Sequence, residues 1–198
     1  RTNKSYATAG VLLMKTEAEL FFKLFEGGTH GFGLIDKTKA TGYDYKHIPP
    51  SFEHYLAHLE GRLSLGIVPI NRKGLTKFGV LDIDDHKKGG IKKDFDFNKL
   101  LKKIKFLKLP LTVCKSKSGG AHCYLLLDTF YKAIDVRHIL KKMSYALGYE
   151  RGSVEIFPKQ DKLLPAESGS FINLPYKGGN SRVVLDFAGT ELNAAEGL

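Results

Sequence analysis

The stretch Lys77-Phe-Gly-Val-Leu-Asp-Ile-Asp-Asp85 ends an apolar run with two carboxylates that are two positions apart. Side chains alternate between the two faces of a strand, so Asp82 and Asp84 project from the same side if this stretch is a β-strand. Adjacent carboxylates repel each other unless they share a proton or a cation. Magnesium or manganese, which prefers oxygen ligands, fits such a pair. Because many Asp-x-Asp pairs are only solvated strand ends, the interpretation needs a third ligand and a phosphate site.

The pattern around this stretch predicts a β-α-β-β-α-β order from residue 78 to residue 157. Residues 78–84 and 154–157 are the expected first and last strands, and residues 111–115 and 121–127 form the expected hairpin between the two helices. Such an order builds an antiparallel sheet covered by two helices on one face, so the predicted fold class is α+β. The apolar positions expected to face the sheet are Phe97, Leu100, Leu101, Ile104 and Leu107 in the first helix, and Val136, Ile139, Leu140, Met143 and Leu147 in the second.

The first part of the chain predicts a smaller α/β module. The capping box Thr16-Glu-Ala-Glu19 indicates the start of a helix, residues 30–36 a strand, and residues 52–60 a helix that follows two prolines. We expect residues 66–70 to pair with residues 78–84 through a basic turn. Pro69 then requires an edge strand or a strand end, because proline cannot donate to the ladder.

Composition favours a polyanionic partner. Lys and Arg number 31 and Asp and Glu number 21, which gives a net charge of +10 and a pI near 9.5. An excess of this size favours nucleic acid, nucleotides or an anionic surface. No apolar run approaches the ~20 residues that span a bilayer, so no membrane partner is expected. The chain starts at Arg1 rather than Met, and we expect a fragment of a longer protein.

The chain contains two cysteines, Cys114 and Cys123, and no secretory signal. This usage predicts a reducing, cytoplasmic location and two buried structural thiols close to one hairpin. A zinc site that uses cysteines alone would need four of them.

A second polar patch supplies the phosphate site. The loop Ser116-Lys-Ser-Gly-Gly120 precedes His122 at the start of the second hairpin strand. Glycines let backbone N–H groups approach phosphate oxygens, lysines supply countercharge, and a positioned histidine donates to a phosphate. A histidine beside a hairpin turn is, taken alone, more often a satisfied core residue.

The third patch is Glu155, which alternates with Val154 and Ile156 and therefore faces away from the apolar layer. Around it lie Lys159, Lys177 and Arg182, each of which is, taken singly, usually a solvated side chain. His54 and His58 stand at i, i+4 on one helix. Tyr55 follows His54 where a zinc peptidase has Glu, so both histidines are expected to serve packing.

In this order the three patches resemble the three signatures of the archaeo-eukaryotic primase superfamily, the primase-polymerases. Leu81-Asp-Ile-Asp84 resembles the first acidic motif, Ser116-Lys-Ser-Gly-Gly-Ala-His122 the nucleotide motif, and Val154-Glu155 the third motif. The likeness covers roughly residues 29–187 and is closest to the TOTE-conflict and CRISPR-associated branch. Stretches 59–69, 156–161, 171–177 and 179–181 also recur there.

The resemblance implies a single catalytic domain over residues 1–198. Its smaller N-terminal α/β module covers approximately residues 1–70, and an RRM-like catalytic module covers approximately residues 71–190, with the active site in the cleft between them. Two departures stand out. Gly120 takes a place where many members have serine, which shifts the expected hydroxyl contact to Ser118 or to backbone. The Cys-rich zinc insertion of this branch is missing after Gly42-Tyr43, so no zinc is expected.

The implied activity is template-directed nucleotidyl transfer, in which NTPs or dNTPs are added to a 3′-hydroxyl with two Mg²⁺ or Mn²⁺ ions. De novo initiation and a role in CRISPR adaptation are further implications. The implied partners are a single-stranded DNA template with its primer, nucleotides, and CRISPR adaptation proteins reached through flanking domains. The implied metal ligands and catalytic residues are Asp82, Asp84 and Glu155, and the implied nucleotide contacts are Lys117, Ser118, Gly119, Gly120, His122, Lys159, Lys177, Arg182 and, as a sugar gate, Tyr43.

Two other interpretations remain open at this point. A metal-dependent glycosyltransferase also uses Asp-x-Asp, but it needs neither a basic pI nor the histidine and second acidic motifs in this order. A catalytically inactive nucleic-acid-binding module would keep the positive charge, but it need not keep all three acidic positions beside His122.

Overall fold

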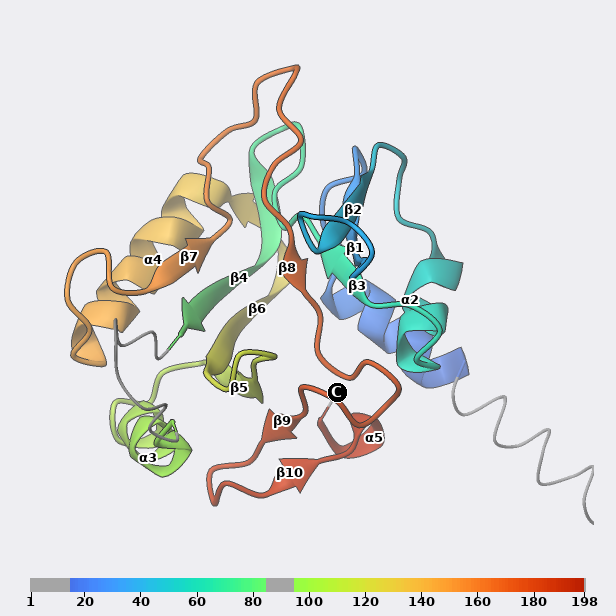
Figure 1. Cartoon of the computed structure of the whole chain (residues 1–198). Coiled ribbons are helices and arrows are strands. Elements are labelled where there is room, and N and C mark those ends of the chain that lie inside the picture. The colour runs from blue at the N-terminus through green and yellow to red at the C-terminus, as the bar shows by residue number, and fades with distance from the viewer. Residues whose placement is uncertain (1–14, 85–94, 198) are drawn as a thin grey trace, which may run out of the picture.

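The computed structural model describes residues 15–84 and 95–197. Arg1, and the loop of residues 85–93 that the sequence places between the first strand and the first helix of this succession, lie outside the described residues. The first helix is described over residues 15–24 and is blue in Figure 1. The elements that follow are β1 (Phe32–Ile35), β2 (Tyr43–Lys46), α2 (Phe52–Leu59), β3 (Leu65–Ile67), β4 (Leu75–Ile83), α3 (Phe97–Phe106), β5 (Thr112–Lys115), β6 (Ala121–Lys132), α4 (Ala133–Ala146), β7 (Glu155–Phe157), β8 (Ile172–Asn173), β9 (Val184–Leu185), β10 (Glu191–Leu192) and α5 (Ala194–Gly197).

The strands form two antiparallel sheets, in agreement with the expected mixed α/β class. The smaller sheet has the order β2-β1-β3-β8 and the larger one the order β10-β9-β5-β6-β4-β7. The expected β-α-β-β-α-β succession is present as β4, α3, β5, β6, α4 and β7. Figure 1 shows β8 running between the two sheets. The smaller sheet, built mainly from the first part of the chain, therefore also contains residues from near the C-terminus.

The expected pairing of residues 66–70 with residues 78–84 is wrong. Both stretches are strands, but β3 pairs with β1 and β8, whereas β4 pairs with β6 and β7. A single bridge, Ile70 to Thr76, is left beside the turn that joins them. The reason is that both edges of β3 are already occupied. Pro69 lies just beyond the end of β3, as the strand-end alternative predicted.

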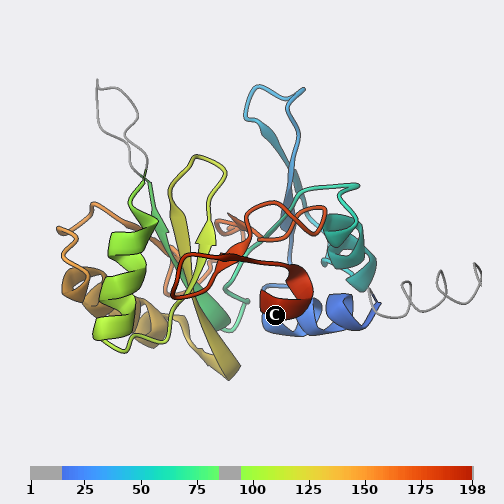
Figure 2. The same ribbon diagram turned by 90° about the horizontal axis from the view of Figure 1, so that it is seen from below.

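Helices α3 and α4 cover one face of the larger sheet (Figures 1 and 2). Helix α3 begins where the Asp96 side chain accepts a hydrogen bond from the backbone N–H of Lys99. It buries Leu100, Leu101 and Ile104 as expected. Helix α4 buries Val136, Leu140 and Ser144, which are four residues apart, so the expectation that Ile139 faces the sheet is wrong. Ile139 is 46% exposed because it lies beside that stripe.

The other face of the larger sheet packs against the N-terminal helices and the smaller sheet. Phe78 of β4 and Tyr124 of β6 share a core with Phe21, Phe25 and Tyr55. The Phe25 ring meets both the Phe78 ring, at 5.6 Å, and the Tyr124 ring, at 5.2 Å, in edge-to-face contacts. Each fully buried aromatic side chain stabilises the fold by roughly 1.5–3 kcal/mol relative to exposure.

Strand β4 therefore serves two cores with alternate residues. Leu81 and Ile83 face α3 and α4, whereas Phe78 and Val80 face the N-terminal helices. The next residue in the second series is Asp82, which consequently points toward the junction of the two sheets. No helix in the described part of the chain is both long and apolar enough to cross a membrane.

Candidate active site

Four residues form a row across the larger sheet at the end of β4. Cys114 lies opposite His122, His122 opposite Asp82, and Asp82 opposite Glu155. Directly opposed residues of antiparallel strands point to the same face. The expectation that Glu155 faces away from the helix-covered layer is confirmed, because Val154 and Ile156 pack in that layer.

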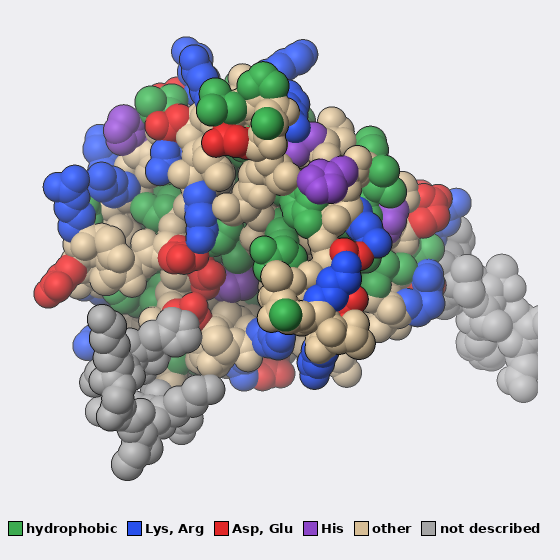
Figure 3. Space-filling view, turned by 45° about the horizontal axis from the view of Figure 1, so that its top comes forward, with side chains coloured by type: hydrophobic (Ala, Val, Ile, Leu, Met, Phe, Trp, Pro, Cys, Tyr) green, Lys and Arg blue, Asp and Glu red, His purple; other side chains and the backbone are tan. Residues whose placement is uncertain are grey.

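A cavity of about 380 Å³ opens where this row meets the smaller sheet. Figure 3 shows Asp and Glu side chains gathered beside a hollow, with a histidine side chain at its floor. Below we call this cavity the cleft. Its lining residues come from strands of both sheets and from the loops beside them, and are Asp82, Asp84, Lys117, Ser118, His122, Phe157, Phe171, Ile172, Asn173 and Arg182.

Asp82 and His122 are in contact at the floor of the cleft. The Nε2 atom of His122 lies 3.2 Å from Oδ1 of Asp82, and both side chains are largely buried. The geometry is not that of a hydrogen bond, and Oδ1 of Asp82 has no hydrogen-bond partner among the described residues. A buried carboxylate oxygen without a hydrogen-bond donor costs free energy. It is therefore an oxygen atom that a cation would stabilise.

The loop between β5 and β6 brings a hydroxyl to the second aspartate. The backbone N–H of Ser116 donates to the carbonyl of Gly120 at 2.8 Å, which closes the turn, and Gly119 has a φ of 92°. Ser118 then donates its hydroxyl to Oδ1 of Asp84. The loop expected to bind phosphate thus lies beside both aspartates.

Gly120 is a glycine because β6 passes very close to β4. A Cβ atom at this position would lie 2.1 Å from the carbonyl oxygen of Ile83. A serine cannot occupy this position without a shift of the strand, which accounts for the departure noted in the sequence. Ser118 lines the cleft instead.

Arg182 is buried, which the sequence did not indicate. Its side chain is 9% exposed, it lines the cleft, and its Nη2 donates to the hydroxyl of Ser64 at 3.0 Å. Its Nη1 is buried and has no hydrogen-bond partner in the described part of the chain. Burial lowers the pKa of this guanidinium. An unpaired buried cation facing a cleft is suited to bind an anion.

Three further cleft residues come from segments that the sequence did not connect with the aspartates. Phe157 ends β7, while Phe171 and Asn173 arrive on the chain that forms β8. The side-chain oxygen of Asn173 is buried and lacks a hydrogen-bond donor within the described residues. The recurrence of stretches 156–161 and 171–177 was the available signal, and it assigned no role to these three residues.

Lys177 and Tyr43 lie next to the cleft rather than in it. Lys177 lines a second cavity of about 690 Å³, which shares Lys117 and Arg182 with the cleft. Six basic side chains line this second cavity, and no acidic one does among the described residues. We call it the cationic pocket, and its basic residues are Lys37, Arg62, Lys115, Lys117, Lys177 and Arg182.

Glu155 is opposite Asp82 on the backbone but does not line the cleft. Its carboxylate pairs with Lys159 at 2.8 Å and its side chain is 61% exposed. Lys159 itself lies over the Phe157 ring at 5.0 Å. Glu155, the expected third ligand, and Lys159, an expected nucleotide contact, are thus paired with each other in this structure.

Comparison with known proteins identifies the family. Residues 33–183, more than half of the chain, match the model of the archaeo-eukaryotic primase domain of the TOTE conflict system. The chain belongs to this primase family. A search of the curated proteins gave no match. Membership indicates a primase-polymerase-like nucleotidyltransferase domain, and the two antiparallel sheets are compatible with it.

The carboxylates of the cleft provide part of a site for a divalent cation. Among the described residues, no group of three or more His, Cys, Asp and Glu side chains stands close enough together to hold an ion. The pair Asp82 and Asp84 nevertheless fits one, because both line the cleft and Oδ1 of Asp82 is buried without a donor. Glu155 is the nearest candidate for a third ligand because of its register with Asp82.

His58 and the two cysteines serve the core, as expected. Nδ1 of His58 accepts from the backbone N–H of Leu65 at 3.0 Å, and its Nε2 lies 2.7 Å from the carbonyl oxygen of Pro175. Burial lowers the pKa of His58 to about 4. Cys114 and Cys123 are free and buried, and burial raises the pKa of both thiols.

Proposed function

We propose that this domain is a template-dependent nucleotidyltransferase, a primase-polymerase that adds NTPs or dNTPs to a 3′-hydroxyl. In this proposal the larger sheet with α3 and α4 is the RRM-like catalytic module, and the cleft between the two sheets is the active site. The observation that carries the proposal is the joint lining of one cleft by Asp82, Asp84, His122 and the buried Arg182.

Asp82 and Asp84, with Glu155 as the third ligand, would hold Mg²⁺ or Mn²⁺. The bound ions supply neutralisation of the triphosphate and activation of the attacking hydroxyl. To act as a ligand, the Glu155 side chain must break its ion pair with Lys159 and turn toward the cleft. This exchange needs a change of rotamer only, since the backbone of Glu155 already lies opposite Asp82.

The remaining cleft residues would position the nucleotide. In the reaction, the 3′-hydroxyl oxygen forms a bond to the α-phosphorus, and the bond to the bridging oxygen breaks as pyrophosphate leaves. Nε2 of His122 and the hydroxyl of Ser118 lie at the aspartates and would donate to phosphate oxygens. The free Nη1 of Arg182 would donate to the same group, since an oxyanion satisfies the buried cation.

The cationic pocket supports a polyphosphate substrate. It adjoins the cleft through Lys117 and Arg182, and its described lining carries basic side chains without carboxylates. Of its basic residues, Arg62 pairs with Glu60 and Lys115 with Glu191. Lys37, Lys117 and Lys177 form no such pair in the described part of the chain. A triphosphate whose α-phosphate lies in the cleft would extend its distal phosphates toward these lysines, with Gly119 and Gly120 keeping the loop close.

Tyr43 remains our candidate for the sugar gate. Its ring lies against Phe171 at 5.2 Å, and Phe171 lines the cleft. Single-stranded DNA with a primer is the proposed partner. The link to CRISPR adaptation proteins rests on the resemblance alone, and so does de novo initiation.

Primer extension tests the function. The parent and Asp82→Asn are compared on a primed single-stranded DNA template with Mg²⁺ or Mn²⁺ and with either nucleotide type. Losing one acidic ligand removes several kcal/mol of transition-state stabilisation, so extension should fall by on the order of a hundredfold or more. Asp128→Asn, the same change at an exposed position of β6, should leave extension intact.

The inactive binding module is the alternative outcome of this experiment. If the parent binds the template but extends no primer with either metal or either nucleotide type, the catalytic proposal is wrong. Equal extension by the parent and Asp82→Asn would place the chemistry elsewhere.

A further inference from the structure

An aromatic cavity of about 460 Å³ lies beside the cleft, between the β1–β2 hairpin and the segment before β8. It shares Phe157 and Phe171 with the cleft, so the two cavities are neighbours. The rings of Tyr43, Tyr45 and His47 complete its wall. We call it the aromatic pocket.

Glycines of the smaller sheet hold two of these rings flat against the strands. A Cβ atom at Gly31 would lie 2.4 Å from the hydroxyl oxygen of Tyr45. At Gly33 and Gly66, a Cβ atom would lie 2.4 Å and 2.3 Å from the Phe171 ring. The rings therefore occupy the space that side chains would fill. Both rings also line the cavity.

Hydrogen bonds fix the segment that faces the hairpin. The Tyr45 hydroxyl donates to the carbonyl oxygen of Ser168, and Nε2 of His30 lies 3.0 Å from the same oxygen. Tyr43 meets the Phe171 ring edge to face at 5.2 Å, with 75° between the planes. The rings are thus positioned before any ligand binds.

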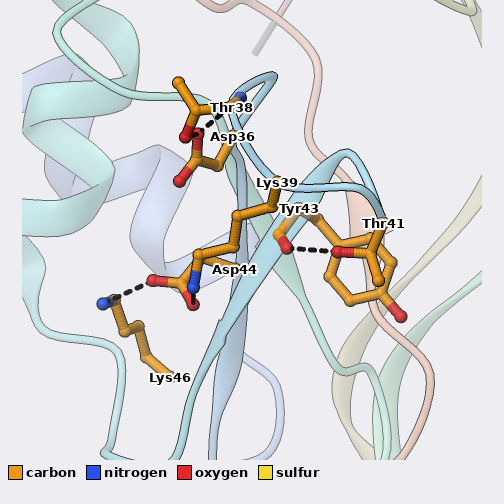
Figure 4. A network of polar contacts seen from close by, with 7 residues as sticks. All are labelled: Asp36, Thr38, Lys39, Thr41, Tyr43, Asp44 and Lys46. Atoms are coloured by element: carbon orange, nitrogen blue, oxygen red, sulfur yellow. Dashed lines mark hydrogen bonds and ion pairs between the residues drawn. The ribbon is translucent and has the colours of Figure 1, made fainter.

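The hairpin tip is held on the face opposite Tyr43. Figure 4 shows Asp44 between Lys39 and Lys46 on one side of the strand and the Tyr43 ring on the other. The Thr41 hydroxyl donates to the carbonyl of Tyr43 at 2.8 Å. These contacts orient the strand so that residues 43, 45 and 47 present their side chains together.

The chemistry of the aromatic pocket suits nucleobases. Flat rings bind bases by stacking whatever their sequence, and a nearby cation holds the phosphate backbone. Lys159 is the cation that lines the aromatic pocket, and no carboxylate lines it among the described residues. The row of three rings, two on β2 and His47 directly after it, is longer than one base requires, which favours a strand over a single nucleotide.

We propose that the aromatic pocket binds the unpaired bases of a single-stranded nucleic acid by stacking and leads them to the cleft. The naming of this strand as the template rests on the proposed function; the binding itself does not. The phosphates of the incoming nucleotide have their basic residues on the other side of the cleft, at Lys117 and Arg182.

Oligonucleotide binding without metal or nucleotide tests the proposal. The fluorescence anisotropy of a labelled single strand is compared with that of a strand of the same length containing abasic sites. The parent should bind the abasic strand at least about fivefold more weakly, because stacked bases are lost. The double variant Tyr43→Leu/His47→Ala should bind the normal strand more weakly than the parent does, by a similar factor. Its affinities for the normal and the abasic strand should be nearly equal.

Tyr145→Leu is the matched control, since Tyr145 on α4 and Tyr43 are both 42% exposed. It should behave as the parent does. The proposal is overturned if the parent binds both strands equally or neither, or if the double variant keeps the preference of the parent. It is also overturned if the double variant changes only the KM for the nucleotide. If the parent prefers the strand with bases but extends no primer, this proposal holds and the catalytic one is wrong.

Discussion

Asp82 of β4 and Glu155 of β7 lie directly opposite each other, although they are far apart in the sequence. Such pairs place their Cβ atoms roughly 4.5–5.5 Å apart on the same face. The Glu155 carboxylate nevertheless pairs with Lys159 at 2.8 Å. Backbone register thus places Glu155 beside Asp82, while its carboxylate is paired with Lys159 at the surface. Because surface ion pairs contribute only about 0–1 kcal/mol, this one is readily exchanged.

Replacement of Glu155 tests whether it completes the acidic site. Glu155→Gln should reduce primer extension by on the order of a hundredfold, since a third ligand contributes several kcal/mol to the transition state. Template binding without metal should stay unchanged. Glu150→Gln, an exposed change outside the row, is the control. Full extension by Glu155→Gln would limit the acidic site to Asp82 and Asp84.

We expect Arg182 to lower the stability of the fold and to strengthen nucleotide binding. Arg182→Met removes a buried cation whose Nη1 has no partner in the described residues, so the free energy of unfolding should rise by about 1 kcal/mol. The KM for the nucleotide should rise at least about tenfold, because a charge-assisted hydrogen bond is worth roughly 1.5–3 kcal/mol. Urea unfolding and extension kinetics measure the two effects. Arg151→Met, at an exposed position, should change neither, and an unchanged KM for Arg182→Met would remove Arg182 from the nucleotide site.

Gly120 should tolerate no side chain. Gly120→Ala places a Cβ atom 2.1 Å from the carbonyl oxygen of Ile83, so the strands must separate. We expect a loss of about 2–3 kcal/mol in the free energy of unfolding, and weaker activity because His122 moves with β6. Gly119→Ala meets nothing within 4 Å and should cost only about 1 kcal/mol for its positive φ. Equal losses for the two variants would contradict the close approach of the strands.

His58 should make stability depend on pH. Its pKa falls to about 4 on folding, chiefly through burial, from 6.5 in the unfolded chain. The unfolded state therefore binds more protons between these values. The stabilisation is fully present above pH 6.5 and is lost as the pH falls toward 4, by at most about 3 kcal/mol.

Urea unfolding from pH 7 to pH 4 measures this effect as a difference between variants. His58→Gln should be less stable at pH 7 but show a shallower decline than the parent. His47→Gln, at an exposed position, should lose stability with falling pH as steeply as the parent does. Parallel curves for the parent and His58→Gln would show that His58 is not the titrating group.

Local periodicity was enough to predict one half of the cleft. Asp82 and Asp84 share a face because strands alternate. The short hairpin sets His122 only against Cys114, and the pairing of β6 with β4 places it opposite Asp82. The helical stripe of α3 followed from spacing alone. Ile139 shows the limit of such patterns, since spacing marks an apolar position but not which edge of the stripe meets the sheet.

The sequence by itself thus determined the β-α-β-β-α-β succession, the shared face of Asp82 and Asp84, and the resemblance to primases. These depend on contacts between residues or strands close in the chain, where alternation and turn geometry leave few choices. Only the tertiary structure decided that β3 leaves β4 for another sheet, that Nη1 of Arg182 is buried without a hydrogen-bond partner among the described residues, and that Phe171 lies on two glycines beside Tyr43. Those outcomes depend on which distant strand occupies each free edge and face, and no local pattern records that competition.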